Sequence, residues 1–434
     1  MHLIIIKMID LKELLKNPKY FKEACKKKNI EVNIDELIEK KKKQNKLIRK
    51  RDDLKHQLKI KSTKNLTDKE KIKLRELKKE IKFLDEEIEK LEKEIFEISR
   101  KIPNPPFDWV PIGESEEDNV VIKEEGEKPK FDFSLKDYLT LAEELDLIDV
   151  KRASKISGSR FGYLKNKLAI LEFAIVKFVF DELTNPETIK NIIEENKLNI
   201  ELKTFIPIVP PVMIKPEIMW GLGYIDDGDI EVFKIPEDNL VLVGTAEHSI
   251  VPYFKDEILE EKELPIRFIG FSTCFRREAG SYGKDVRGIL RVHQFDKLEM
   301  VSFTLPEKSV EEHKFLLSVE EYLMKKLKIP YRVIHICTGD LGPPAAEKFD
   351  IEAWIPSENR YRETHSCSNT TDFQARRLNI RVKRKNKIEY VHILNGTAFA
   401  IGRTLIAIME NFQTKDGHIK IPEVLTKYVN FDII

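Results

Sequence analysis

The chain has 434 residues, 35% of them charged and 41% hydrophobic, and its formal net charge is +1. This length predicts two or three domains with a large core, and the near-neutral balance excludes a basic field over the whole molecule. Any surface for nucleic acid must therefore be local. No stretch approaches the length of a membrane span, and the first nine residues lack the basic segment of a signal peptide. We expect a cytoplasmic protein that does not associate with a membrane.

The four cysteines are Cys25, Cys274, Cys337 and Cys367. None of them belongs to a C-x-x-C pair, and no histidine stands at the spacing of a zinc finger. We therefore expect reduced thiols and no zinc.

Helical patterns dominate the first hundred residues. The apolar run over residues 1–9 predicts a strand, and residues 9–25 predict short helices that break near Pro18. A long helical segment then opens at Asn33, and the polar stretch 62–65 separates it from a second one. In the second segment, steps of three and four join Leu74, Leu77, Ile81, Leu84, Ile88, Leu91, Ile95 and Ile98. This heptad seam predicts an antiparallel helical hairpin that ends before Pro103.

The two helices of this hairpin differ in their balance of charge. The first helix is crowded with basic residues against few acids, whereas the returning helix is nearly balanced. A basic arm of this kind suits a long partner lined with phosphates, although an apolar stripe or a charge run is also typical of packing, dimerisation or a solvated face. The candidate contacts are Lys42, Lys46, Arg49, Lys50, Arg51 and Lys55.

A proline-rich boundary follows at residues 102–106. We predict one domain over residues 1–105 and a second over 106–434, with the polar, acidic stretch up to Lys130 acting as linker and domain entry. The sequence contains neither the phosphate loop G-x-x-x-x-G-K-[S/T] nor the dinucleotide fingerprint G-x-G-x-x-G. A nucleotide, if one is used, is not bound through either of those two folds.

The second domain opens with an apolar helix predicted over residues 165–182 and an apolar strand over 205–214. Pro211 in this strand suits an edge or an interface, because proline has no N–H to donate to a neighbouring strand. An ordinary buried helix and strand would show the same pattern.

The most informative stretch is Gly270–Val301. Two apolar runs flank a turn-rich insert at residues 279–285, which predicts an antiparallel hairpin with a long loop. One arm carries a basic pair followed by an acid, and the other carries further charged residues; these are Arg276, Arg277 and Glu278, then Arg291, His293, Lys297 and Glu299. Arginine offers a planar fork of donors for phosphate or carboxylate, while a solvated charged hairpin is the alternative.

The order F-R-x-E, then A-G-S-Y-G, then H-Q-F-x-K-x-E resembles motif 2 of the class II aminoacyl-tRNA synthetases, in the form found in seryl-tRNA synthetases. Residues 165–214 resemble motif 1, and residues 394–411, where small residues lead into a helix bearing Arg403, resemble motif 3. The resemblance runs from about Met8 to Tyr428 and is weakest over residues 106–133. When the usual N-terminus of the family is aligned with Met8, the first seven residues form a short extension. Whether translation starts at Met1 or at Met8 is left open.

This resemblance implies an α+β fold, in which an antiparallel β-sheet of the class II synthetases is flanked by helices and preceded by an N-terminal, antiparallel α-helical coiled-coil arm. It implies a homodimer that activates L-serine with ATP and Mg²⁺ and transfers serine to tRNA(Ser). Charging of tRNA(Sec) is left open. The arm is expected to bind tRNA through the basic residues named above.

The resemblance also implies site residues. The expected ATP contacts are Arg276, Arg277, Glu278, Val292, Phe295, Glu363, Thr364, His365, Ser366 and Arg403, with Glu363 and Ser366 at the Mg²⁺ ion. The expected serine contacts are Thr245, Ala246, Glu247, Arg276, Glu299, Asn395 and Thr397. Where bacterial members commonly carry a small residue, this chain has His365, and we expect that position to use only its backbone.

Activation of an amino acid by ATP brings two anions together, so the site needs cations rather than a nucleophile of its own. Arg276 is expected to bridge the α-phosphate and the carboxylate of serine, and Arg403 to bind the γ-phosphate; these are the two catalytic candidates. Two alternative functions are an amino acid:carrier-protein ligase, which lacks the arm, and a non-catalytic paralogue that binds RNA through the coiled coil. The arm argues against the first, and the presence of Arg276, Glu278, Glu299 and Arg403 argues against the second.

Overall fold

The computed structural model describes residues 8–61, 67–224, 231–278 and 287–434. The chain divides into two compact units, Lys7–Pro105 and Pro106–Ile434. Three expected features lie outside the described residues: the first seven residues of the strand expected over 1–9, the connection at 62–65 and the insert at 279–285. In the described ranges, no helix is long and apolar enough to cross a membrane.

The first unit is helical. Its helices are α1 (Leu11–Lys16), α2 (Pro18–Lys27), α3 (Ile34–Lys61) and α4 (Asp68–Ser99). The break before Pro18 is confirmed, because that proline stands at the first position of α2, where no backbone N–H is needed. The side chain of Asn33 accepts from the N–H of Glu36 at 3.1 Å and so caps the start of α3.

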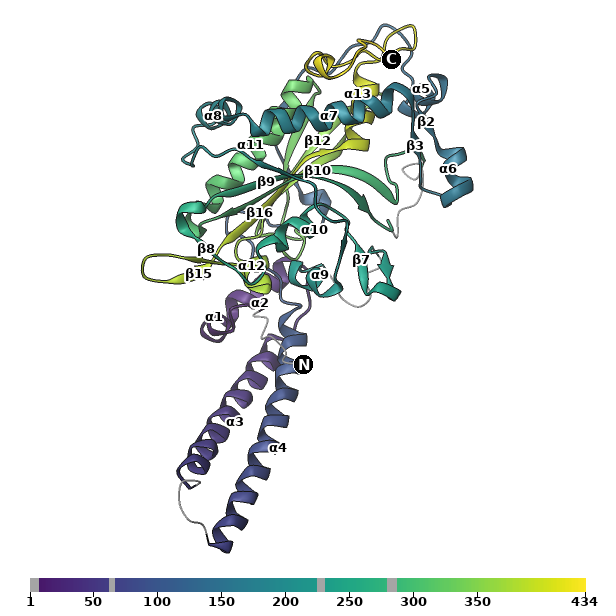
Figure 1. Ribbon diagram of the computed structural model, residues 1–434. Helices are drawn as coiled ribbons and strands as arrows, with labels where there is room; N and C mark the ends of the chain where they lie inside the picture. Colours follow the sequence, from purple (N-terminus) through teal and green to yellow (C-terminus); the bar gives the residue numbers. More distant parts are fainter. Residues whose placement is uncertain (1–7, 62–66, 225–230, 279–286) are drawn as a thin grey trace. The chain divides into compact units, whose positions relative to one another are not determined.

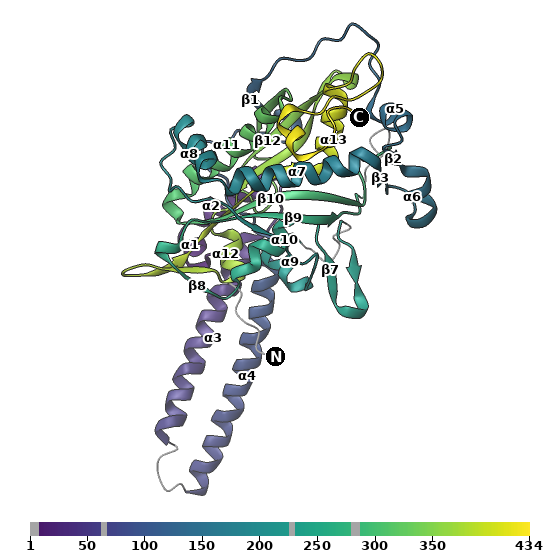
Figure 2. The ribbon, with the colours of Figure 1, turned by 45° about the horizontal axis from the view of Figure 1, so that its top comes forward.

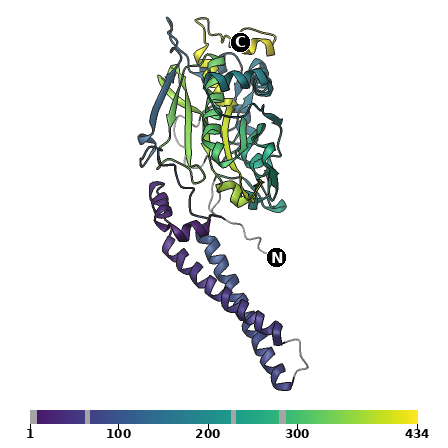
Figure 3. The same cartoon turned by 90° about the vertical axis from the view of Figure 1, so that its left-hand side faces the viewer.

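The predicted helical hairpin is confirmed by α3 and α4, which lie side by side along their length (Figures 1 and 3). The centre of the predicted seam on α4 is buried, as expected for knobs that pack against the facing helix; these residues are Ile81, Leu84, Ile88, Leu91 and Ile95. A small apolar cluster that includes Phe21, Leu37 and Ile95 packs α1 and α2 against one end of the pair.

The second unit is built on a large sheet. Among the described residues this sheet has eight strands in the order β1-β11-β12-β13-β16-β10-β9-β4. The strands are β1 (Val120–Glu125), β4 (Ile206–Ile208), β9 (Ile266–Phe275), β10 (Gln294–Thr304), β11 (Tyr331–His335), β12 (Glu347–Ile355), β13 (Arg360–Asn369) and β16 (His392–Ala400). All neighbours run antiparallel except β4 and β9. With the helices around it, this sheet confirms the expected α+β fold.

One face of the sheet is covered by the long helices α7 (Asn166–Thr184), α11 (Ser309–Leu327) and α13 (Ile401–Asn411). Figures 1 and 2 show α7 lying across β9 and β10. Apolar side chains such as Phe178, Phe315 and Leu405 pack there against Leu298 and Met300 of β10. The opposite face of β10, β13 and β16 is therefore the one that can carry polar chemistry.

The remaining elements border the sheet. The helices are α5 (Tyr138–Glu144), α6 (Val150–Ser157), α8 (Pro186–Glu195), α9 (Pro216–Leu222), α10 (Glu247–Ile250) and α12 (Phe373–Leu378). The small sheets are formed by β2 (Ile148–Asp149) with β3 (Tyr163–Leu164), by β5 (Met213–Ile214), β7 (Leu240–Leu242) and β6 (Lys234–Ile235), and by β15 (Ile388–Tyr390), β14 (Arg381–Lys383) and β8 (Ile258–Glu260).

Two expectations about strands were wrong. The single strand expected over residues 205–214 is two strands, β4 and β5, which belong to different sheets. The cause is Pro210-Pro211 between them, since two consecutive residues without an N–H cannot continue a ladder. The stretch expected to be a linker contains β1, which pairs with β11 along one edge of the large sheet.

Candidate active site

The β9–β10 hairpin is confirmed, with Phe275 opposite Gln294 and Gly270 opposite Glu299. Because side chains alternate across a strand, Lys297 and Glu299 face away from the core that holds Leu298 and Met300. The neighbouring strand β16 places Thr397 directly opposite Glu299, and the hydroxyl of Thr397 lies 3.4 Å from Oε2 of Glu299.

A cleft follows this polar face and has two adjoining parts. The first, here called the arginine half, has about 630 Å³ of empty space and contains Arg403 and Phe295. The second, the carboxylate half, has about 1420 Å³ counted out to its open mouth and contains Glu247 and Glu299. Arg276 lines both halves.

Backbone carbonyls and a carboxylate hold the two catalytic candidates in place. The backbone N–H of Arg276 donates to the carbonyl of His293 at 3.0 Å, and its Nε donates to the carbonyl of Gly244 at 3.0 Å. The guanidinium of Arg403 donates to the carbonyl of Glu363 at 2.8 Å and lies 3.3 Å from the carboxylate of the same residue. Both arginine forks are therefore oriented before any substrate arrives.

The carboxylate of Glu363 lies among cations. Although burial opposes its ionisation, the charges of Arg403, Lys348 and Arg276 lower the pKa of Glu363. Ser366 of the same strand, β13, lines both halves of the cleft. This end of the site therefore offers a carboxylate oxygen and a hydroxyl beside the arginines.

His365 has a buried side chain. Its Nδ1 lies 2.8 Å from the hydroxyl of Thr364, and its ring packs edge-on against Phe399. Burial lowers the pKa of His365 to about 3, so the imidazole is neutral at physiological pH. It cannot serve as a cation for a phosphate, in keeping with a position that uses only its backbone.

Glu278 and Arg277 diverge just after β9. Glu278 is in the left-handed region with φ 50°, and its carboxylate lies 3.4 Å from Nη1 of Arg291 on the cleft wall. Arg277 turns aside, because its Nε donates to the carbonyl of Val232 at 3.2 Å and its guanidinium lies 4.8 Å from the ring centre of Phe233.

In the carboxylate half, Glu247 has a perturbed pKa. Its carboxylate accepts from Nε2 of Gln374 at 2.9 Å and from the hydroxyl of Tyr224 at 3.3 Å. Burial first, and the charge of Glu299 second, raise the pKa of Glu247 to about 7. The carboxyl of Glu247 therefore gains and loses its proton near physiological pH.

His248 follows Glu247 on α10 and is neutral. Its Nδ1 accepts from the N–H of Gly244 at 3.2 Å, which places the proton on Nε2. Burial and the charges of Arg276 and Lys297 lower the pKa of His248 to about 3.

Most of the expected site residues are brought together by the fold. The arginine half contains Arg276, Glu278, Val292, Phe295, Glu363, Thr364, His365, Ser366, Thr397 and Arg403. The carboxylate half contains Thr245, Glu247, Arg276, Glu299 and Asn395. Two expected residues do not line either half: Arg277, which turns aside, and Ala246, which is fully buried in an apolar cluster with Met219 and Ile250.

Several residues of the cleft had no assigned role in the sequence-based prediction. The main ones are Tyr224, Arg291, Lys297, Lys348 and Ser368. Lys297 could have been found, because a lysine two residues before a glutamate on a strand shares its face. Arg291 lies in the same motif 2 stretch, whereas Tyr224, Lys348 and Ser368 come from separate elements.

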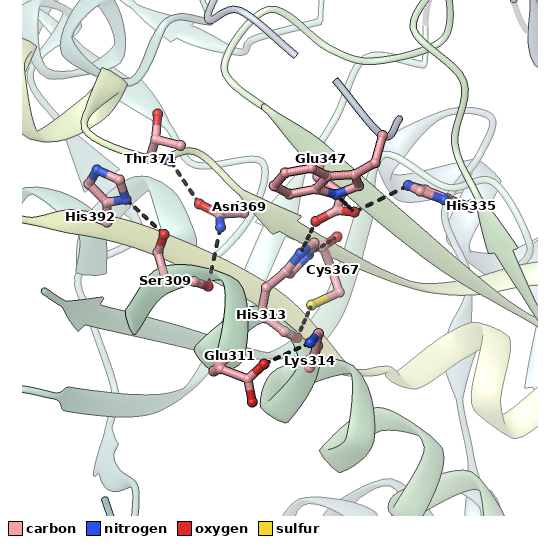
Figure 4. A network of polar contacts seen from close by, with 11 residues as sticks. Ser309, Glu311, His313, Lys314, His335, Glu347, Cys367, Asn369, Thr371 and His392 are labelled. Atoms are coloured by element: carbon pink, nitrogen blue, oxygen red, sulfur yellow. Dashed lines mark hydrogen bonds and ion pairs between the residues drawn. The ribbon is translucent and has the colours of Figure 1, made fainter. Parts of the chain in front are cut away.

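A buried polar cluster anchors β12 and β13 from the core side of the sheet (Figure 4). Nδ1 of His313 lies 3.1 Å from Oε2 of Glu347, and its Nε2 lies 3.0 Å from the carbonyl oxygen of Cys367. Nε1 of Trp109 donates to the other oxygen of Glu347 at 2.8 Å, and Nε2 of His335 lies 3.3 Å from it. Although burial alone would raise it, these partners lower the pKa of Glu347 to about 2.

The carboxylate and the carbonyl that face the two ring nitrogens of His313 are both hydrogen-bond acceptors, so the ring is held between two acceptor groups. His313 is only 1% exposed. Buried polar contacts of His313, as well as apolar packing, therefore tie α11 to the strands that reach the cleft.

In the arm, the six basic candidates fall into two groups. Acids pair with three of them: Lys50 lies 2.8 Å from Glu80, Arg51 lies 2.6 Å from Asp52, and Lys55 lies 3.4 Å from Asp85. The other three, Lys42, Lys46 and Arg49, are exposed and have no ion pair within the described residues.

Comparisons with known proteins agree over the whole chain. Residues 232–412 match the family model "tRNA synthetase class II core domain (G, H, P, S and T)", and residues 8–106 match "Seryl-tRNA synthetase N-terminal domain". Curated proteins named serine--tRNA ligase from Thermodesulfovibrio yellowstonii and Dictyoglomus thermophilum are 39% and 44% identical to this chain. The matches cover 98% of this chain and 100% and 99% of those proteins.

A solved structure is also similar. It is the crystal structure of seryl-tRNA synthetase from Pyrococcus horikoshii complexed with ATP. The TM-score is 0.87 at 36% sequence identity, and the match covers 98% of this chain and 99% of that one.

Proposed function

Because this chain belongs to the seryl-tRNA synthetases, the enzymes that join serine to tRNA with ATP, we propose which of its residues carry each step. Neither the carrier-protein ligase nor the non-catalytic paralogue is favoured, since relatives named serine--tRNA ligase match the chain from end to end. The observation that carries the proposal is the position of Arg276, which lines both halves of the cleft.

In the activation step, a carboxylate oxygen of serine attacks the α-phosphorus of ATP and pyrophosphate leaves. Arg276 binds the serine carboxylate and the α-phosphate together, which holds the two anions in line for attack. Arg403 binds the γ-phosphate of the leaving pyrophosphate. No side chain has to act as nucleophile, because the substrate itself supplies one.

Glu363 and Ser366 would hold Mg²⁺ together with ATP. A carboxylate and a hydroxyl are hard oxygen donors of the kind that Mg²⁺ prefers. Within the described residues no group of three or more His, Cys, Asp or Glu side chains could hold a metal by itself. When bound, Mg²⁺ neutralises the charge of the phosphates.

The adenine ring lies between Phe295 and Arg403, with its exocyclic amine directed to Glu278. The guanidinium carbon of Arg276 already lies 5.4 Å from the ring centre of Phe295, so the phosphate-binding arginine and the stacking ring are neighbours. Stacking on an aromatic ring contributes about 1–3 kcal/mol per base.

Serine is recognised in the carboxylate half. Glu299 accepts from the ammonium and the hydroxyl of serine, and Thr245, Asn395 and Thr397 add hydrogen bonds. A site that hydrogen-bonds a substrate hydroxyl rejects analogues without one by about 10⁴-fold, because its buried polar groups are then left unpaired. Threonine is excluded by its extra methyl group.

The basic arm binds tRNA(Ser), and aminoacylation assays with tRNA(Ser) and tRNA(Sec) side by side test whether both are charged. The contacts go mainly to phosphates, since Lys and Arg on a helix read the backbone and shape of RNA rather than its bases. A cytoplasmic location, as expected from the sequence, is part of this proposal.

The protein acts as a homodimer. On α7, Phe173 is 64% exposed and Ile170 is 48% exposed, and nearby Ile206 of β4 is 49% exposed. Large apolar side chains gathered on one surface are typical of a subunit interface. Sedimentation of wild type and Phe173→Asp tests this part, and a monomeric wild type would contradict it.

The central test is ATP–pyrophosphate exchange with serine, threonine, alanine, cysteine, proline and glycine side by side. We expect exchange with serine alone and its loss in Arg276→Ala. Exchange with another amino acid would overturn the serine assignments of the pocket. No exchange by the folded protein would overturn the assignment of the cleft.

A further inference from the structure

One wall of the carboxylate half is used by neither ATP nor serine in the assignments above. It includes Lys348 and Ser368, which line only this half. Because this half opens to solvent, a third substrate can reach the wall beside the bound serine.

The register of β12 and β13 places Lys348 on the cleft face. Lys348 pairs with Ser368, and Asp350 pairs with Ser366, which lines the cleft. The alternate residue Glu347 faces the core, where its carboxylate contacts His313 (Figure 4). The buried cluster therefore fixes from behind the strand that presents Lys348.

Asp350 orients the ammonium of Lys348. Nζ of Lys348 lies 3.1 Å from Oδ2 of Asp350, and the Lys348 side chain is 24% exposed. Asp350 is 8% exposed, and its Oδ1 has no hydrogen-bond partner among the described residues. Burial opposes the charge of Lys348, but Asp350 and Glu363 raise its pKa, so the side chain is a cation at physiological pH.

The other cations of the cleft line both halves or are assigned to ATP. Lys297 and Arg291 line both halves and lie 2.5 Å from Glu299 and 3.4 Å from Glu278, and the two catalytic arginines serve ATP. Lys348 also has a carboxylate neighbour, Asp350, but it lines only the carboxylate half and so lies beside the serine site and outside the half that holds ATP. The third substrate of the reaction is the 3′ end of tRNA, which brings phosphates into the cleft.

We propose that Lys348 binds the phosphate next to the 3′-terminal adenosine of tRNA, and so positions the acceptor end beside the activated serine. This inference rests on the proposed function. It makes Lys348 a residue of the transfer step, with Asp350 as the residue that positions it.

The test compares the two half-reactions in the full-length enzyme. Wild type, Lys348→Met, Lys348→Arg and the control Lys325→Met, an exposed lysine on α11, are assayed for pyrophosphate exchange and for single-turnover transfer from preformed seryl-adenylate to tRNA(Ser). Removing a charge-assisted hydrogen bond to phosphate corresponds to about a tenfold or larger effect. We expect Lys348→Met to lower transfer at least tenfold more than it lowers exchange, and Lys348→Arg to recover most of the transfer rate.

Salt dependence gives a second readout. Removing the cation that binds one phosphate reduces the slope of log kcat/KM for tRNA against log salt by about 1, and Lys325→Met should leave it unchanged. Lys348→Met/Asp350→Asn replaces the single variant if an unpaired Asp350 impairs folding. Equal losses in exchange and transfer, or no loss in either, would overturn the inference. Absence of exchange in wild type would instead overturn the proposed function and the inference with it.

Discussion

Nζ of Lys297 lies 2.5 Å from Oε2 of Glu299, and the two side chains are 9% and 2% exposed. The two residues stand two positions apart on β10, so the strand itself brings them to one face. Lys297 thereby offsets the cost of burying the carboxylate that we assign to the ammonium and hydroxyl of serine.

We therefore predict that Lys297→Met destabilises the enzyme and raises the KM for serine. Removing one partner of a buried ion pair costs about 3–5 kcal/mol, because the other charge is left without compensation. The double variant Lys297→Met/Glu299→Gln should regain stability in urea unfolding but not serine-dependent exchange. A single variant as stable as wild type would contradict the role of the pair.

Arg403 and Arg277 should respond differently to substitution, although both are expected from sequence to contact ATP. Arg403→Ala should lower kcat/KM for ATP in exchange by about 100-fold or more, and Arg403→Lys should recover little, since an ammonium cannot form the planar fork. Arg277→Ala is the matched control, and its loss should stay below about tenfold because its guanidinium faces Phe233. Equal losses would show that Arg277 reaches the nucleotide.

Serine affinity should depend on pH through Glu247, whose pKa is raised to about 7. The ammonium of serine favours the carboxylate form, so the KM for serine should fall by up to about tenfold as pH rises from 6 to 8. Glu247→Gln should flatten this profile. A wild-type KM that is constant over that range would contradict the assignment.

The same raised pKa has a consequence for folding. The neutral carboxyl of Glu247 contributes stability that is fully present below its unfolded pKa near 4.5 and is lost as pH rises through about 7. This sign is opposite to that of a carboxylate that is stabilised in its charged form.

Glu347 is such a carboxylate, since its pKa is lowered from 4.5 to about 2. Its contribution to stability is present above pH 4.5 and is lost as pH falls toward 2, with a total of at most about 3 kcal/mol. Glu347→Gln should therefore lower the free energy of unfolding at pH 7, and the gap to wild type should narrow in acid. Urea unfolding from pH 7 down to 3 measures this gap, and a gap independent of pH would contradict the lowered pKa of Glu347.

The two groups of basic residues on α3 should differ in their effect on tRNA. The triple variant Lys42→Ala/Lys46→Ala/Arg49→Ala should reduce the salt slope of tRNA binding by about 3, because each of the three cations would otherwise bind one phosphate. The triple variant Lys50→Ala/Arg51→Ala/Lys55→Ala should reduce it less, because acids already partly neutralise those cations. Filter binding over a range of salt concentrations measures both slopes, and equal slopes would contradict the distinction.

Patterns that are local in the chain were predictable. The heptad steps on α4 specify a helix with one apolar stripe. The hairpin of β9 and β10 follows from two apolar runs around a turn-rich insert. Both patterns are formed by residues close together in the chain, so they can be read without the rest of the fold. The resemblance through Arg276, Glu299 and Arg403 also identified the family, and with it the fold and the activity.

Other features depend on contacts between distant segments, and only the tertiary structure decided them. β1 is a strand because β11 offers it an edge, while Val120, Val121 and Ile122 stay 43%, 44% and 51% exposed and show no alternation of burial. Lys348 belongs to the cleft because β12 pairs with β13 in a register that no single segment encodes. Sequence alone determined which residues carry the charges; strand pairing decided which of those charges meet, because burial and neighbours are properties of the assembled sheet.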